Sequence, residues 1–165
     1  MSYKPLLAVS GLLWLTVSLS AADTAFLKDA CQGGLMEMKL GELAQTNAAS
    51  EEVKEFGRRM VADHGRMNQD VQEVAGRQGV SLPTEVSMKD EVSYELLSHK
   101  TGPEFDRAYI EDMVKDHKAD IAAFQKEVDS GTDQHAQAVA AKALTTIKAH
   151  LKLAQEIAGR LGVPQ

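Results

Sequence analysis

The amino-acid sequence predicts an all-α protein, a four-helix bundle made of two helical hairpins. Beyond residue 22 the chain is rich in Ala, Glu, Lys, Gln, Leu and Met, and it has prolines there only at positions 83, 103 and 164. This composition favours helix. Four long segments repeat their apolar residues with the 3.6-residue period of a helix. Only two or three residues separate the first segment from the second and the third from the fourth, so each pair is expected to fold back on itself.

The N-terminal segment has the layout of a secretory signal peptide over residues 1–22. Lys4 is followed by an apolar run from Leu6 to Leu19 and then by small residues. The run is too short and too early for a comfortable membrane span. We expect cleavage after Ser20 or Ala22, with a retained anchor helix as the alternative. The mature protein is then a single periplasmic or secreted domain, residues 23–165.

The four predicted helices cover residues 24–48, 51–78, 104–130 and 133–161. Their start and stop signals are Ser50 and Gly79 for the second helix, Thr101 with Glu104 for the third, and Thr132 or Asp133 and Gly162 for the fourth. Glycines at positions 33, 34, 41 and 57 weaken helix interiors and therefore predict close helix approach.

A long connection over residues 80–103 joins the two hairpins. It contains a predicted short helix, 88–99, introduced by Ser87 and Asp90. Its length allows it to cross the full height of the bundle. Two hairpins joined by one long crossover form the ferritin-like arrangement, whereas short loops throughout would give an up-down bundle.

A short motif occurs twice in the chain. An aromatic residue followed by Met-Val-x-Asp-His ends at His64 and again at His117, 53 positions later. Both copies lie within predicted helices, on faces that are expected to be buried. The repeat favours a bundle of two related halves with histidines turned inward.

Each predicted helix carries one ionisable residue in its apolar stripe: Glu37, His64, His117 and His150. Around a turn near residue 50, His64 lies within roughly one helical turn of Glu37. Around a turn near residue 131, His117 lies about a turn from His150. If the hairpins dock in register, the four side chains converge on one centre.

Three imidazoles and a carboxylate suit a first-row transition metal such as Zn, Cu or Fe. Met60 and Met113 each precede a histidine by one turn, and thioethers would favour copper. Asp63 and Asp116 lie about 100° around the helix from their histidines, which makes them candidates for partners of the ligands. The alternative is a metal-free polar network among the same four side chains.

The charge and the cysteine content restrict the partners. The net charge is −6, and becomes −7 without Lys4, which argues against nucleic acid and anionic lipid. No segment of the mature chain is apolar for long enough to span a bilayer. The single cysteine, Cys31, excludes an intramolecular disulfide; it is a buried filler or a thiol for intermolecular pairing, which leaves a homodimer open. His99 and His135 fall outside the stripes and are expected to be exposed.

The sequence resembles the ferritin-like family called domain of unknown function 4142. The resemblance rests on motifs in order along the chain: Gly33-Gly34-x-x-Glu37, Leu40-Gly41-x-Leu43-Ala44, Met60-Val61-x-Asp63-His64, Phe105-Asp106-x-x-Tyr109, Met113-Val114-x-x-His117 and His150-Leu151. It implies an exported bacterial protein with a ferritin-like four-helix fold and no established activity, often labelled an outer-membrane protein. The chain lacks the Glu-x-x-His motif of di-iron ferritin-like sites.

These observations favour metal binding for storage, buffering or redox protection. The competing hypothesis is a non-catalytic envelope or stress-related module whose polar core only sets the register of the helices. We find no nucleophile motif, phosphate loop or Cys-x-x-Cys in the sequence. An enzymatic role is therefore disfavoured, and the one compatible with the residues is a metal-dependent oxidoreductase.

Overall fold

The computed structural model describes residues 20–164, and within them all regular structure is helical. The five helices are α1 (Ala21–Asn47), α2 (Glu51–Gln78), α3 (Met88–Ser98), α4 (Gly102–Ser130) and α5 (Gln134–Leu161). The predicted all-α bundle is confirmed. Most of the predicted signal peptide lies outside the described residues, but Ser20 caps α1 and Ala21 begins it.

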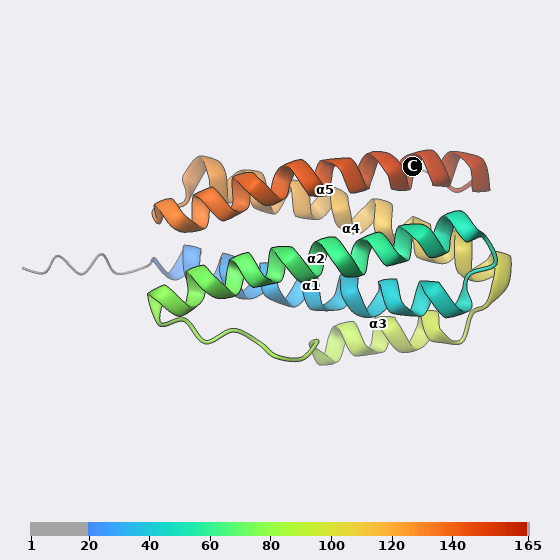
Figure 1. Ribbon diagram of the computed structural model, residues 1–165, viewed down its shortest axis with the longest axis horizontal. Helices are drawn as coiled ribbons and strands as arrows, with labels where there is room; N and C mark the ends of the chain where they lie inside the picture. Colours follow the sequence, from blue (N-terminus) through green and yellow to red (C-terminus); the bar gives the residue numbers. More distant parts are fainter. Residues whose placement is uncertain (1–19, 165) are drawn as a thin grey trace, which may run out of the picture.

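The four long helices form two antiparallel hairpins that lie side by side (Figure 1). Helix α1 packs on α2, α4 packs on α5, and the hairpins meet along the α2–α5 and α1–α4 seams. The segment from α2 to α4, which includes α3, runs the length of the bundle, so that α2 and α4 point in the same direction. The predicted long crossover is therefore present.

The helix ends follow the predicted signals in part. Gly79 and Gly162 end α2 and α5 with φ angles of 68° and 64°, a left-handed conformation that glycine adopts readily. Asp133 caps α5 by accepting hydrogen bonds from the next turn. Ser50 and Thr101 occupy the predicted cap positions, but neither side chain makes a capping hydrogen bond. The predicted Thr101–Glu104 capping arrangement was wrong, since its hydrogen bonds are absent and Glu104 pairs with Lys100 instead. Helix α4 also begins at Gly102, two residues before its predicted start.

A buried aspartate from the other hairpin binds the backbone at the start of α2. Asp106 of α4 accepts hydrogen bonds from the backbone N–H groups of Ala49 and Ser50, at 3.0 and 2.9 Å. At the other end of the bundle, Asp23 of α1 accepts from the backbone N–H of Thr132 at 2.9 Å. Each hairpin thus uses a carboxylate to bind the turn of the other hairpin, which sets the register between them.

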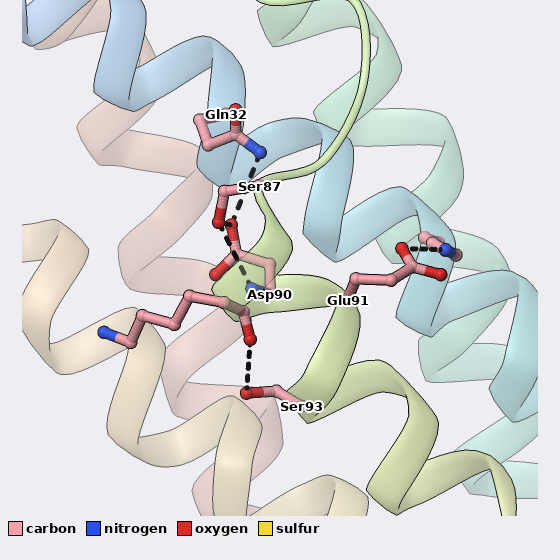
Figure 2. A network of polar contacts seen from close by, with 7 residues as sticks. Gln32, Ser87, Asp90, Glu91 and Ser93 are labelled. Carbon is pink, nitrogen blue, oxygen red and sulfur yellow. Dashed lines mark hydrogen bonds and ion pairs between the residues drawn. The ribbon is translucent and has the colours of Figure 1, made fainter.

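Helix α3 packs against α1 through mostly polar contacts (Figure 2). Ser87 caps the helix by accepting from the backbone N–H of Asp90. Lys39 of α1 pairs with Glu91 at 2.5 Å and lies 4.1 Å from the centre of the Tyr94 ring. The outer face of α3 leaves Met88, Val92 and Leu96 exposed. No helix among residues 20–164 is long and apolar enough to cross a membrane.

Close packing of α1 on α2 depends on two glycines. A Cβ atom added to Gly41 would lie 2.6 Å from the backbone oxygen of Gly57, and one added to Gly57 would lie 2.7 Å from the oxygen of Gly41. A Cβ atom added to Gly34 would lie 2.2 Å from the side-chain oxygen of Asn68. The predicted close approach is confirmed at these positions but wrong at Gly33, where an added Cβ meets nothing within 4 Å.

Cys31 lies in the core and has no exposed surface. Its thiol faces the backbone oxygen of Pro83 at 3.5 Å, and burial raises the pKa of the thiol above its ordinary value. Cys31 therefore acts as a small buried side chain, the first of the two predicted roles.

We predict that Gly41→Ala destabilises the protein although alanine is the better helix former. The added methyl group would collide with backbone, and overpacking of this kind costs about 1–3 kcal/mol. Gly33→Ala is the matched control on the same helix; with open space at its Cβ it should gain roughly 0.5–1 kcal/mol. Urea unfolding of both variants measures the difference. Equal stability of the two would contradict the close α1–α2 contact.

Candidate metal centre

Three histidines from three helices meet in the middle of the bundle. His64 lies on α2, His117 on α4 and His150 on α5, and one nitrogen from each ring lies within 4.8 Å of the others. The ring centres are 5.4–5.7 Å apart. None of the three side chains is more than 4% exposed. Since α2 and α4 run in the same direction, the repeated Met-Val-x-Asp-His motif places its two histidines at the same height.

Packing around the histidines holds the rings in place. Phe56 lies with its ring centre 6.5 Å from those of both His117 and His150. Met60 and Met113, one turn before His64 and His117, are fully buried in the same hydrophobic cluster as Phe56. The apolar surroundings keep water from the rings of His117 and His150, so their nitrogens need partners within the protein or in a bound ligand.

Two of the three rings have one nitrogen held by the protein. The Nδ1 atom of His117 lies 2.9 Å from the backbone oxygen of Met113. The Nε2 atom of His150 lies 2.9 Å from a carboxylate oxygen of Asp63. Because these partners are acceptors, the ring nitrogens facing them must carry the proton. The opposite nitrogens, Nε2 of His117 and Nδ1 of His150, are then left with free lone pairs.

Those free nitrogens have no hydrogen-bond partner among residues 20–164. The buried unpaired atoms include Nε2 of His64, Nε2 of His117 and Nδ1 of His150, one from each ring. Histidines that bind a metal through one nitrogen almost always donate the other N–H to a carboxylate or a carbonyl. His117 and His150 show this pattern, with Met113 and Asp63 as the acceptors.

Asp63 is thus placed next to His150, although the two residues belong to different hairpins. It directly precedes His64 in the sequence and yet pairs with His150 of α5. Arg59 and Arg66 flank its carboxylate at 3.4 and 3.0 Å. Burial would raise the pKa of Asp63, but the hydrogen bond from His150, together with Arg59, lowers it below its ordinary value. The carboxylate therefore stays charged at neutral pH.

The histidines themselves are neutral at neutral pH. Burial, followed by the neighbouring rings, lowers the pKa of His64 well below its ordinary value. Burial and His150 lower the pKa of His117 to about 4. Burial also lowers the pKa of His150, against the opposing effect of Asp63. Neutral imidazole is the form that binds metal ions.

Glu37 lies beside the cluster. Its Oε1 atom is 3.9 Å from Nδ1 of His117, the nitrogen that faces Met113, and its Oε2 atom has no partner among the described residues. Burial raises the pKa of Glu37 well above its ordinary value, and the negative charges of Asp120, Asp116 and Asp112 raise it further. The carboxyl group of Glu37 is therefore neutral beside His117. Its role as a fourth metal ligand stays a prediction.

The remaining sequence-predicted residues lie further out. Asp116 is exposed on α4 and acts on the centre only through its charge. His99 and His135 are exposed, as predicted. Sequence reasoning missed Tyr109 as a polar group: its hydroxyl is buried without a partner in the described part of the chain, and burial and Glu37 raise its pKa. Its position about two turns before His117 on the same helix face could have indicated that it is buried near the cluster.

An open cavity of about 390 Å³ leads from the surface to His64. Its lining comes from all four long helices and is mainly apolar, including Phe26, Phe124 and Ile147. Of the three histidines, His64 alone belongs to its wall. Sequence reasoning missed this cavity, because it exists only where residues of four helices leave space between them.

A second buried carboxyl belongs to the cavity wall. Glu127 is 7% exposed, and its Oε1 atom has no hydrogen-bond partner within residues 20–164. Burial, followed by the adjacent Asp23 carboxylate, raises the pKa of Glu127 to about 7. Burial also acts to raise the pKa of Asp23, but hydrogen bonds from Thr132 and Ser20 outweigh it and lower the pKa to about 2.

The comparisons with known proteins agree with this fold. The model of the DUF4142 family, described as a domain of unknown function, matches residues 16–157. The chain belongs to the DUF4142 family. A comparison with curated proteins gives no significant match.

Two solved structures resemble this DUF4142 protein. A DUF305 fragment from Deinococcus radiodurans superposes with a TM-score of 0.76 at 13% identity, over 86% of this chain and 98% of the other. A DUF305 protein from Streptomyces coelicolor, described as secreted, gives a TM-score of 0.73 at 13% identity, over 87% and 96%. At this identity the likeness supports the helical-bundle fold alone, and a relationship to ferritin stays a prediction.

We predict that Glu127→Gln stabilises the protein more at pH 8 than at pH 5. The wild-type carboxyl keeps its proton up to about pH 7 when folded but only to its ordinary pKa of 4.5 when unfolded. The wild-type free energy of unfolding therefore falls as the pH rises between these values, by about 1–3 kcal/mol, whereas glutamine has no proton to lose.

Urea unfolding across this pH range provides the measurement. Glu111→Gln, at an exposed position of the same helix, is the matched control and should show a much smaller pH-dependent difference. A difference between Glu127→Gln and wild type that stays constant or shrinks with rising pH would contradict the buried carboxyl pair.

Proposed function

We propose that this DUF4142 protein binds one first-row transition metal ion at His64, His117 and His150. The observation that supports the proposal best is the set of three buried, unpaired nitrogens that face one another from three helices. Three imidazoles are the ligand set of many zinc sites, and imidazole also suits copper, iron and nickel. The adjacent buried Met60 and Met113 favour copper if a sulfur atom joins the ligands.

A metal-free polar network accounts less well for the same geometry. His117 and His150 are held so that their free nitrogens can only accept hydrogen bonds. His64 could donate to one of them through a single N–H, so the other is paired only if the neutral carboxyl of Glu37 donates to it, and is otherwise left unsatisfied at a cost of about 1–3 kcal/mol. A metal ion would satisfy all three lone pairs at once.

The role that fits this centre is storage, buffering or redox protection outside the cytoplasm. The signal-peptide pattern supports export, and one structural neighbour is described as a secreted protein. Three protein ligands leave a fourth coordination position for water, Glu37 or a substrate, and a metal-dependent oxidoreductase would need this position. We place passive metal binding first, because the three unpaired nitrogens support binding directly, whereas an oxidoreductase also needs a substrate at the fourth position.

The deciding experiment is elemental analysis of the mature protein, purified without chelators or a metal-binding tag. We expect close to one metal ion per chain and a melting temperature that rises with one of the added ions Zn, Cu, Fe, Mn and Ni. Binding at 100 times the dissociation constant would stabilise the fold by about 2.7 kcal/mol.

The His64→Ala/His117→Ala variant should lose both the metal and the ion-dependent stabilisation. The variant His99→Ala/His135→Ala removes the same number of imidazoles from exposed positions and should keep both. Circular dichroism shows whether each variant retains its helices. Equal metal content in the two variants would overturn the proposal and leave the cluster as a structural network.

We predict that Asp63→Asn weakens metal binding about 10–100-fold, the usual cost of losing a partner of a metal-binding histidine. The carboxylate holds the Nε2 proton of His150 and makes the ring a better donor to the ion. Asp70→Asn on the same helix removes an exposed ion pair with Lys142 instead and should leave the affinity unchanged. Competition with a chromogenic chelator measures both, and equal affinities would contradict the role of Asp63.

A further inference from the structure

The cavity beside His64 has the properties of a small-molecule site in its own right. Its volume of about 390 Å³ lies within the usual range for such sites, roughly 300–1,000 Å³. Most of its surface is apolar, and Phe26 and Phe124 form part of the wall, in edge-to-face contact with their ring centres 5.0 Å apart. A few polar groups in a mainly apolar wall are the usual composition of a ligand pocket.

Two buried polar side chains, those of His64 and Glu127, belong to the wall. His64 is 4% exposed and Glu127 is 7% exposed. Glu127 lies almost three turns beyond His117 on α4, roughly 15 Å along the helix axis, while His64 lies level with His117. An elongated ligand with a polar group at each end could contact both side chains.

The charges around the cavity favour a positively charged ligand. Asp29, Asp120 and Glu127 contribute acidic groups to the lining, against the single cation Lys126, whose side chain is exposed. Glu127 also lies next to the Asp23 carboxylate. A cation placed there would relieve the repulsion between the carboxyl groups and could also rest on the faces of the aromatic rings.

We propose that this cavity binds a small hydroxylated aromatic amine. Its ammonium group pairs with Glu127, its ring packs against Phe26 and Phe124, and its hydroxyl group reaches His64. A hydroxyl group can both donate and accept, so it fits either protonation state of the imidazole. The site requires no metal ion, although a metal at the histidine cluster would share His64 with it.

Titration calorimetry with tyramine tests the proposal on the mature protein after removal of metal by a chelator. Tyramine should bind at least tenfold more tightly than 4-hydroxyphenylacetate, which has a similar size and the opposite charge. It should also bind more tightly than phenethylamine, which lacks the hydroxyl group. Equal binding of the cation and the anion, or no binding of any of these probes, would overturn the proposal. Because metal is absent throughout, this result is independent of the metal-binding hypothesis.

Variants at Gly33 and Glu127 test whether tyramine binds in the cavity. Gly33 belongs to the wall and has open space where a side chain would begin, so Gly33→Phe should fill the cavity and abolish tyramine binding. Gly33→Ala occupies little of the space and should bind within about threefold of wild type. Glu127→Gln should weaken tyramine about tenfold or more, as expected for a lost charge-assisted hydrogen bond, and leave the uncharged probe p-cresol unaffected. Undiminished binding of tyramine to Gly33→Phe would show that it binds elsewhere.

Discussion

The burial of three imidazole rings in the middle of a helical bundle is the constraint on which the rest of this structure depends. A buried polar atom without a partner costs free energy, and the apolar packing around Phe56 excludes the water that could otherwise pair with it. The protein satisfies the outer nitrogens of His117 and His150 with Met113 and Asp63. The inner nitrogens are left facing one another without hydrogen-bond partners in the described residues, and this observation is the basis of the proposed metal site.

The scaffold holds the rings together by controlling how the two hairpins meet. Asp106 binds the turn of the first hairpin, and Asp23 binds the turn of the second, so the hairpins are tied at opposite ends of the bundle. Gly41 and Gly57 bring α1 and α2 into backbone contact in between. A slide of one hairpin along the other would have to break these hydrogen bonds before it could separate the histidines.

The electrostatics divide the interior into two regions. Burial keeps the histidines neutral, and Asp63, held by Arg59 and Arg66, supplies the one charged partner of the cluster. Along α4, burial and the neighbouring Asp116 raise the pKa of Asp120 to about 7, and burial and the neighbouring Asp23 raise the pKa of Glu127 to about 7. The cluster therefore suits a metal ion, while the cavity beside it suits an organic cation.

The sequence by itself determined the helices, the two hairpins and the inward histidines, because apolar periodicity and short turns act locally. It also singled out Asp63, but not its partner: the contact with His150 joins residues on different hairpins and depends on how they dock. The same limit explains Glu37, which shares the expected height and yet lies beside His117 instead of among the free nitrogens. Only the tertiary structure decided these contacts, the hydrogen bonds of Asp106 at the start of α2, and the cavity, since each depends on the rotation and spacing of helices that are distant in sequence.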